Sequence, residues 1–234
     1  MSKIEIKNVS CFDFLPKIKD DSVDLFLIDP PYIISKDTGL ESCVNGVERF
    51  KMSYKFGEWD ESFTGLNIVI EEAYRTLKKG GTFICFYDIW KITILKEMME
   101  KEKFKQIRFI EWVKNNPVPI NSKINYLTNS REIALTGTKI GKPTFNSEYD
   151  DGIYNFPICH EKGRFHPTQK PLSLIKKLVE KHSNENDLIL DCFLGSGTTA
   201  AACLETNRNF IGCELDSSYY EKIIQRMECY NDKS

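Results

Sequence analysis

Hydrophobic residues recur along the chain in two alternating patterns, which together predict its secondary structure. Short apolar runs indicate buried strands, whereas apolar residues spaced at i, i+3, i+4 and i+7 indicate amphipathic helices. The predicted strands cover residues 4–6, 23–28, 82–87, 107–113, 132–138, 188–190 and 210–213. The predicted helices cover residues 66–77, 92–101, 172–179 and 220–227, and one more helix follows the loop that begins at Asp191.

The alternation of strands with helices favours an α/β fold, in which a mostly parallel sheet carries helices on both faces. Right-handed crossovers in such a sheet place every loop that follows a strand along one edge, where ligands bind. Gly80 and Gly81 are expected to end the helix at 66–77. Side chains that follow different strands should therefore meet at this edge, however far apart they lie in sequence.

Two long stretches do not fit the alternation. Residues 33–62 are polar and show little periodicity, and residues 115–165 are rich in Asn, Pro, Gly and Tyr. Long irregular segments of a compact domain usually carry function or are disordered. We expect one domain over residues 1–234, with these two segments near its site.

Composition narrows the class of protein. The chain has 234 residues, of which 41% are hydrophobic and 28% are charged, as is typical of a soluble domain with a sizeable core. It has no apolar run of 18 residues and no signal-peptide pattern at its start, which favours a cytoplasmic location. The eight cysteines form no Cys-x-x-Cys pair, so reduced thiols are expected rather than disulfides or a metal site.

The net charge of −2 counts mildly against a nucleic-acid partner, because phosphate binding favours positive charge. Lysines and arginines nevertheless cluster within residues 36–55 and 114–164. A solvated surface explains these clusters almost as well as a phosphate contact does.

A glycine loop follows the predicted strand at 188–190. The run from Gly195 to Ala200 fits Gly-x-Gly-x-x-Ala, the pattern of a nucleotide-binding turn, and Glu214 ends the next strand, where a carboxylate can bind ribose hydroxyls. Asp191 would repel a pyrophosphate but would attract the ammonium and sulfonium of S-adenosylmethionine. Phe193 is suited either to contact the cofactor or to fill the core. A structural corner that merely needs glycine is the alternative.

A second motif, Asp-Pro-Pro-Tyr, spans residues 29–32 directly after a predicted strand. The exocyclic amine of adenine or cytosine is a poor nucleophile, and two acceptors on its N–H groups would free its lone pair. Asp29 and the Pro30 carbonyl can supply these acceptors, with Pro31 restricting the backbone of Pro30. Tyr32 offers a face on which a base can stack. A base inside a duplex cannot reach this site, so the nucleotide must be flipped out.

Four motifs in this order resemble the family of DNA methyltransferases that modify adenine N6 or cytosine N4. They lie at residues 22–32, at 166–171 (His-Pro-Thr-Gln-Lys-Pro), at 191–199 and at 210–214. The order resembles the permuted subgroup, often called beta, in which the catalytic tetrapeptide precedes the cofactor loop. The resemblance implies a Rossmann-like methyltransferase fold with a circularly permuted motif order and S-adenosylmethionine as the cofactor.

The resemblance implies roles for individual residues. Asp29, Pro30, Pro31 and Tyr32 would form the catalytic site. The implied cofactor-binding residues are Ser10, Cys11, Asp29, Thr168, Lys170, Asp191, Phe193, Gly195, Ser196, Gly197, Thr198 and Glu214. Among them, Thr168 and Lys170 would lie near the cofactor carboxylate, whereas His166 would position the chain. The family usually has Gly-Asp where this chain has Val9-Ser10, so the contact that this Asp makes to the cofactor's adenine would here fall to the Ser10 hydroxyl or to the backbone of Cys11.

The resemblance also assigns the two irregular segments. Residues 33–62 would form a mobile loop over the flipped base, with Trp59 as its anchor or as ordinary core, and residues 115–165 would form an inserted target-recognition segment. In that segment, Asn121, Asn125, Tyr126, Asn129, Lys139 and Lys142 are suited to base edges and phosphates. The expected partners are double-stranded DNA, a second copy of the chain and a cognate restriction nuclease.

Several functions compete at this stage. In the family that the chain resembles, Asp at the first position of the tetrapeptide is commoner among adenine enzymes and Ser among cytosine enzymes, so the resemblance implies adenine N6 as the methylated atom, with cytosine N4 as the alternative. A protein or RNA amine methyltransferase is disfavoured by Asp29 and by the order of the motifs. A non-catalytic DNA-binding subunit with the same fold is disfavoured because the tetrapeptide and the glycine loop are both intact.

Overall fold

The protein is seen here as a computed structural model that describes residues 2–31, 40–44, 47–52, 65–117, 127–158 and 164–231. Its strands are β1 (Ile4–Asn8), β2 (Val23–Ile28), β3 (Leu40–Val44), β4 (Val47–Met52), β5 (Leu77–Tyr87), β6 (Lys105–Lys114), β7 (Arg131–Thr138), β8 (Ile153–Phe156), β9 (Leu188–Asp191) and β10 (Asn209–Glu214). Its α-helices are α1 (Cys11–Phe14), α3 (Leu66–Thr76), α4 (Ile92–Lys101), α5 (Leu172–His182), α6 (Thr198–Glu205) and α7 (Ser217–Asn231). Two short 3-10 helices, η1 (Leu15–Lys17) and η2 (Ile89–Lys91), complete the elements of the described residues.

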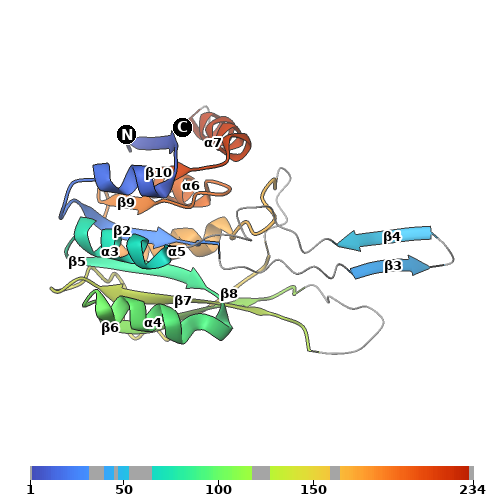
Figure 1. The fold of residues 1–234 in the computed structure, drawn as a ribbon, viewed down its shortest axis with the longest axis horizontal. Coiled ribbons are helices and arrows are strands. Elements are labelled where there is room, and N and C mark those ends of the chain that lie inside the picture. The colour runs from blue at the N-terminus through green and yellow to red at the C-terminus, as the bar shows by residue number, and fades with distance from the viewer. Residues whose placement is uncertain are drawn as a thin grey trace.

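An eight-stranded sheet forms the centre of the molecule, in the order β1-β10-β9-β2-β5-β7-β6-β8 (Figure 1). Neighbouring strands from β1 to β5 in this order are parallel, and so are β6 and β8. The strand β7 is antiparallel to both of its neighbours, β5 and β6. The predicted mostly parallel α/β sheet is confirmed, with one correction. For β7 it is the beginning of the strand, not its end, that lies at the edge where the other strands end.

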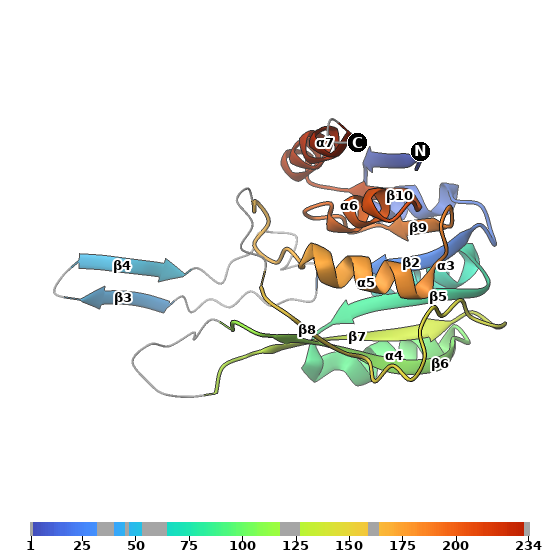
Figure 2. The ribbon, with the colours of Figure 1, turned by 180° about the vertical axis from the view of Figure 1, so that it is seen from behind.

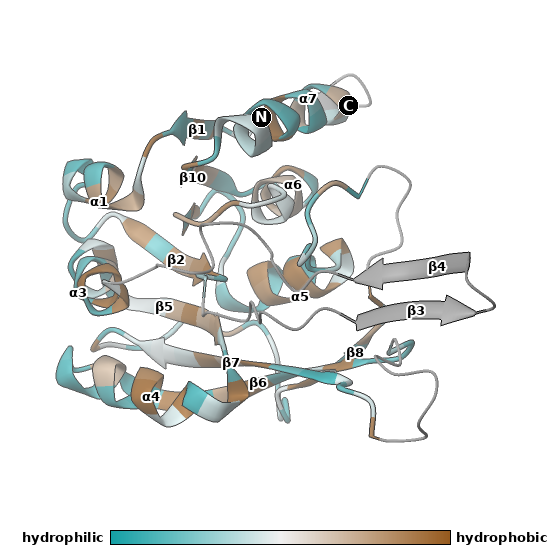
Figure 3. Ribbon diagram, turned by 45° about the vertical axis from the view of Figure 1, so that its right-hand side comes forward, coloured by the Kyte–Doolittle hydropathy of each residue, from teal (hydrophilic) through white to brown (hydrophobic). Residues whose placement is uncertain are grey.

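Helices cover both faces of the sheet, as Figures 1 and 2 show from opposite sides. Leu25 and Phe26 of β2 illustrate why, because successive side chains of a strand point to opposite faces and both of these are fully buried. Phe26 packs in a core with residues of α3 and α4, whereas Leu25 packs in a second core with residues of α5 and α6. Hydrophobic and hydrophilic positions alternate around α3, α4 and α7 (Figure 3), as expected for helices with one buried side.

The predicted end of the helix at 66–77 is wrong. This helix, α3, ends at Thr76, and Gly80 and Gly81 lie inside β5. Gly80 has φ +82°, and a Cβ there would lie 2.3 Å from the Lys142 carbonyl oxygen. Gly80 therefore permits the close approach of the loop at Lys142 to the sheet.

The two irregular segments contain some regular backbone. The strands β3 and β4 pair antiparallel inside residues 33–62, and both β7 and β8 lie inside residues 115–165. The rest of the predicted mobile loop, including Trp59, lies outside the described residues, as do Asn121, Asn125 and Tyr126. None of the described helices is long and apolar enough to cross a membrane.

Candidate active site

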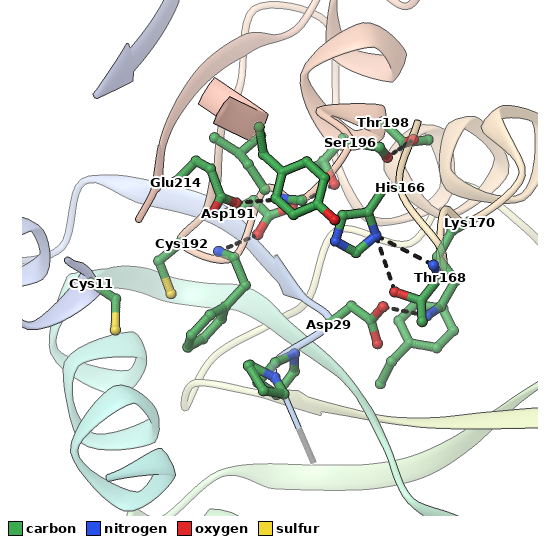
Figure 4. Close-up of a pocket in the computed structure, with 18 of the residues that line it drawn as sticks. Cys11, Asp29, His166, Thr168, Lys170, Asp191, Cys192, Ser196, Thr198 and Glu214 are labelled. Atoms are coloured by element: carbon green, nitrogen blue, oxygen red, sulfur yellow. Dashed lines mark hydrogen bonds and ion pairs between the residues drawn. The ribbon is translucent and has the colours of Figure 1, made fainter. Parts of the chain in front are cut away.

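A cavity of about 320 Å³ lies where β2, β9 and β10 end (Figure 4). This volume is in the range of pockets that hold small ligands. Of the predicted site residues, those that line the cavity are Ser10, Cys11, Asp29, Pro30, Pro31, Thr168, Lys170, Asp191, Phe193, Gly195, Ser196, Thr198 and Glu214. Tyr32 lies outside the described residues. The edge of the parallel strands thus gathers predicted residues that are up to 204 positions apart in sequence (Ser10 to Glu214).

Asp29 directly follows β2, and its two carboxylate oxygens differ in their hydrogen bonding. Lys170 donates a hydrogen bond from Nζ to Oδ2. The other oxygen, Oδ1, is buried and accepts no hydrogen bond from the described residues. Burial raises the pKa of the Asp29 carboxyl above its usual range, although Lys170 acts in the opposite direction. A buried acceptor without a donor is costly, so Oδ1 is suited to an N–H group that arrives with a ligand.

Lys170 is almost fully buried, at 6% exposure. Besides Asp29, it pairs with Glu132, whose Oε2 lies 3.1 Å from Lys170 Nζ, and Nζ lies 5.0 Å from the ring centre of Phe86. Glu132 in turn pairs with Lys114 at 2.8 Å. The prediction that Lys170 lies beside a cofactor carboxylate stays a prediction, because the contacts in the structure are to carboxylates of the protein. Sequence reasoning missed Glu132, whose only signal is its place at the start of a predicted strand.

Asp191 ends β9 and is buried, with 4% exposure. Its Oδ1 accepts the backbone N–H of Phe193 at 2.9 Å, and its Oδ2 accepts the Thr199 hydroxyl at 2.7 Å. Burial raises the pKa of Asp191 to about 7, against the effect of these two hydrogen bonds. Thr199 was not among the predicted site residues, and its place in the Thr-Thr pair of the glycine loop was its available signal.

Glu214 ends β10 and holds the glycine loop. Its Oε2 accepts the backbone N–H of Gly195 at 2.7 Å, and its Oε1 accepts that of Asp216 at 2.9 Å. Burial raises the pKa of Glu214, and both hydrogen bonds act in the opposite direction. Each oxygen keeps a second lone pair, so the carboxylate can still accept hydrogen bonds from a ligand.

Gly195 and Gly197 both have positive φ, +51° and +72°. Gly197 does not line the cavity. A Cβ at this position would lie 2.8 Å from Cγ2 of Ile223 in α7, so glycine here allows α7 to pack against the start of α6. In the same loop, the Ser196 and Thr198 hydroxyls lie 2.8 Å apart, and Arg226 donates to the Ser196 carbonyl at 2.9 Å.

His166 lines the cavity beside the glycine loop, and a Cβ at Gly195 would lie 3.2 Å from its Nε2. Its ring centre lies 4.7 Å from that of Tyr219, and its Nδ1 lies 3.2 Å from the Thr168 hydroxyl. Burial lowers the pKa of His166 to about 4, so the ring is neutral at neutral pH. This geometry agrees with the predicted positioning role. Tyr219 was missed by the sequence analysis because it lies at the start of the last helix, outside every recognised motif.

The remaining predicted residues sit at the start of α1. Ser10 caps this helix, with its hydroxyl oxygen accepting the Phe12 N–H at 3.2 Å. Burial raises the pKa of the Cys11 thiol to about 11, which keeps it protonated. Phe193 lines the cavity and also packs against the core on the α3 face, so both of its predicted roles fit.

Known proteins resemble this chain over nearly its whole length. A Type II methyltransferase of Moraxella bovis, M2.MboI, is 31% identical over an alignment of 235 positions, and the match covers 91% of this chain and 83% of the relative. The Streptococcus pneumoniae Type II methyltransferase M2.DpnII is 30% identical and covers 99% of this chain and 92% of its own length.

Solved structures share the fold. The crystal structure of the M1.HpyAVI-SAM complex superposes with a TM-score of 0.71 at 28% identity, covering 95% of this chain and 99% of that one. PvuII DNA methyltransferase, described as cytosine-N4-specific, reaches a TM-score of 0.75 at 15% identity, covering 99% and 91%, which is a likeness of fold alone. The family model for N6 and N4 methyltransferases, described as DNA methylase, matches residues 23–226. With Asp29, Pro30 and Pro31 lining one cavity together with the glycine loop, this chain belongs to the DNA methylase family.

Proposed function

We propose that this protein transfers a methyl group from S-adenosylmethionine to the exocyclic amine of a flipped-out base in DNA, with adenine N6 as the acceptor. The observation that carries the proposal is that Oδ1 of Asp29, in the wall of the cavity, is buried and accepts no hydrogen bond from the described residues. An amine N–H is the group that would satisfy this oxygen, and membership of the DNA methylase family supplies the class of substrate.

The residues around the cavity fit S-adenosylmethionine. Asp191 and Glu214 bring two carboxylates to the walls. They suit a ligand that carries an ammonium, a sulfonium and ribose hydroxyls but no phosphate. The M1.HpyAVI neighbour is described as a complex with SAM, which supports the same cofactor here. Phe193 supplies an apolar surface beside these polar groups.

The cofactor supplies the electrophilic methyl group. Asp29 Oδ1 and the Pro30 carbonyl accept the two N–H groups of the amine and so make its lone pair available for attack. Pro31 disfavours helical backbone at Pro30 and keeps that carbonyl extended. The methylated nitrogen must then lose one proton, and Asp29 is the carboxylate beside it. Tyr32, as a stacking surface for the base, stays a prediction.

The choice of adenine rests on Asp29 at the first position of the tetrapeptide. The fold does not select the base, since the cytosine-N4-specific PvuII enzyme shares it. Double-stranded DNA is the proposed substrate, with residues 115–165 as the segment that reads its sequence and residues 33–62 as the loop over the flipped base. A homodimer and a cognate restriction nuclease stay predictions. Light scattering with and without DNA tests the first, and a lone monomer in both would contradict it.

One experiment tests the function and the choice of base together. The protein is incubated with mixed-sequence DNA and S-adenosylmethionine, and the DNA is digested to nucleosides for mass spectrometry. N6-methyladenine, absent with Asp29→Ala, is the expected product. N4-methylcytosine alone would overturn the choice of base but keep the class of reaction. No methylated base, despite measured cofactor binding, would overturn the proposed function.

A further inference from the structure

A row of four alternating charges runs from the reaction site into the antiparallel half of the sheet. It consists of Asp29, Lys170, Glu132 and Lys114, which come from the end of β2, the segment before α5, the start of β7 and the end of β6. Three ion pairs join these residues in series. The chemistry described above uses only the first of them.

We propose that Glu132 is a positioning residue that acts through Lys170: by sharing the ammonium, it fixes Lys170 on Asp29 Oδ2 and leaves Asp29 Oδ1 for the substrate amine. This inference rests on the proposed function for the role of the amine. The geometric part, that Glu132 controls the state of Asp29, is a property of the protein alone.

The contacts support a shared ammonium. Lys170 is 6% exposed, and its Nζ forms an ion pair at 3.1 Å with Glu132 Oε2, a buried atom that accepts no hydrogen bond from the described residues. The ring of Phe86 lies 5.0 Å from the same nitrogen and favours a cation there. A lysine held from two sides by carboxylates has little freedom to swing toward Asp29 Oδ1. A single carboxylate would allow the ammonium to bridge both oxygens of Asp29 and block the acceptor.

The charges also balance. Two partly buried carboxylates, Asp29 and Glu132, face two ammonium groups, Lys170 and Lys114, and Lys114 lies 2.8 Å from Glu132. Removing one charge from such a buried set leaves another without compensation, which is strongly unfavourable. Glu132 thus supplies the second negative charge of the set, so that the two carboxylates and the two ammonium groups together carry no net charge.

The direction of the electrostatic effect makes the role testable. Asp29 in turn raises the pKa values of Asp191 and Cys85, and Lys170 lowers the pKa of His166, so these three titratable groups face the same charges. The negative charge of Glu132 raises the pKa of Asp29, whereas Lys170 lowers it. Removing the Glu132 charge should therefore lower the pKa of Asp29, and removing the Lys170 charge should raise it. A residue that only packs in the fold, without a charge that acts on Asp29, would leave the pKa of Asp29 unchanged when its carboxylate is removed.

The test compares Glu132→Gln with a matched control, Glu111→Gln. Glu111 lies on the adjacent strand β6, has a side chain 24% exposed against 25% for Glu132, and also forms an ion pair, with Arg131 at 3.2 Å. The carboxyl carbon of Asp29 is titrated by carbon-13 NMR in the free protein and assigned by its absence in Asp29→Asn. We expect a lower midpoint in Glu132→Gln, a higher one in Lys170→Met and no change in Glu111→Gln.

The kinetic arm uses the same variants. Glu132→Gln should lower kcat by about tenfold to a hundredfold with little change in KM for S-adenosylmethionine, since a misplaced catalytic group affects the chemical step. Glu132→Asp keeps the charge, so the titration midpoint of Asp29 in this variant should stay near that of the wild type. If Glu132→Gln does not fold, this midpoint is the measurement that tests the inference. An unchanged Asp29 midpoint in Glu132→Gln, or equal shifts in Glu132→Asp and Glu132→Gln, would overturn the inference. A wild type without methylation would instead overturn the proposed function, and the NMR arm would still stand.

Discussion

Gly195 donates its backbone N–H to Oε2 of Glu214 at 2.7 Å, so the turn of the glycine loop is tied directly to the end of the next strand. The two residues are 19 positions apart, and each belongs to a different predicted motif. The carboxylate proposed to bind the ribose therefore also sets the shape of the loop beneath the methionine end of the cofactor.

Replacing Glu214 should weaken cofactor binding for two separate reasons. Glu214→Ala removes the ribose acceptor and also leaves the Gly195 N–H without its carboxylate, which together should cost roughly 2–4 kcal/mol of binding free energy. Glu214→Gln keeps one acceptor oxygen and should lose less. Calorimetry with S-adenosylmethionine measures both, and equal affinity of Glu214→Ala and the wild type would contradict the assignment.

Asp29→Ala should abolish methyl transfer, with a fall in rate of at least about a hundredfold, because it removes the acceptor that activates the amine. Binding of S-adenosylmethionine and of DNA should survive. Asp24→Asn is the matched control, since Asp24 is on the same strand and pairs with Lys78 at 2.8 Å, away from the cavity. Single-turnover methylation of DNA measures the rates. Activity within a few-fold of the wild type in Asp29→Ala would show that this carboxylate is not the acceptor.

Asp191 predicts two opposite effects of pH. Its pKa is raised by burial from 3.8 to about 7, so its contribution to stability is present at low pH and is lost as the pH rises from about 4 through 7. The ionised form is the one that attracts the cofactor's ammonium. Cofactor affinity should therefore rise over the same range, up to the pH at which the ammonium itself begins to deprotonate, near 8.

Asp191→Asn provides the check for this pair of effects. Melting temperature without ligand and affinity for S-adenosylmethionine are each measured between pH 5 and about 7.5, the range in which the cofactor's ammonium stays mostly charged. Both pH dependences should flatten in the variant. If the variant keeps the wild-type pH dependence of affinity, another group controls binding.

Gly197→Ala should destabilise the fold more than it disturbs the cavity. The new Cβ would occupy backbone with φ +72° and would lie 2.8 Å from Cγ2 of Ile223. Strain and overpacking of this kind cost about 1–3 kcal/mol each. Thermal unfolding measures the loss, and Ile223→Ala in the same background should recover the packing part but not the backbone part. A melting temperature equal to that of the wild type would refute the role of this glycine.

Local patterns were sufficient for much of the fold. The run of apolar residues at 23–28 and the periodic residues at 92–101 match β2 and α4 in both bounds, because burial sets these patterns directly. Gly80 and Gly81 were misread because glycine ends helices and also permits close approaches within a strand, and only the neighbouring loop at Lys142 distinguishes the two.

The site residues also fall into two groups, those that sequence motifs predict and those that only the folded structure reveals. Asp29, Asp191 and Glu214 could be predicted because each ends a strand inside a motif. Glu132 and Tyr219 could not, because they reach the site through tertiary contacts made by an antiparallel strand and by a helix outside the motifs. Nothing in the period of an apolar strand reveals its direction, so the reversal of β7 and the role of its first residues were hidden from sequence reasoning.

The reversal of β7 has a consequence for how such enzymes can diversify. Because β6 ends and β7 begins at the same edge, the chain that connects them leaves and re-enters the sheet between Lys114 and Arg131. At this point an ion pair joins the two strands, with Lys114 Nζ 2.8 Å from Glu132 Oε1. Because this ion pair fixes both ends of the connection, the connection can change in length and sequence during evolution without moving the residues of the cavity.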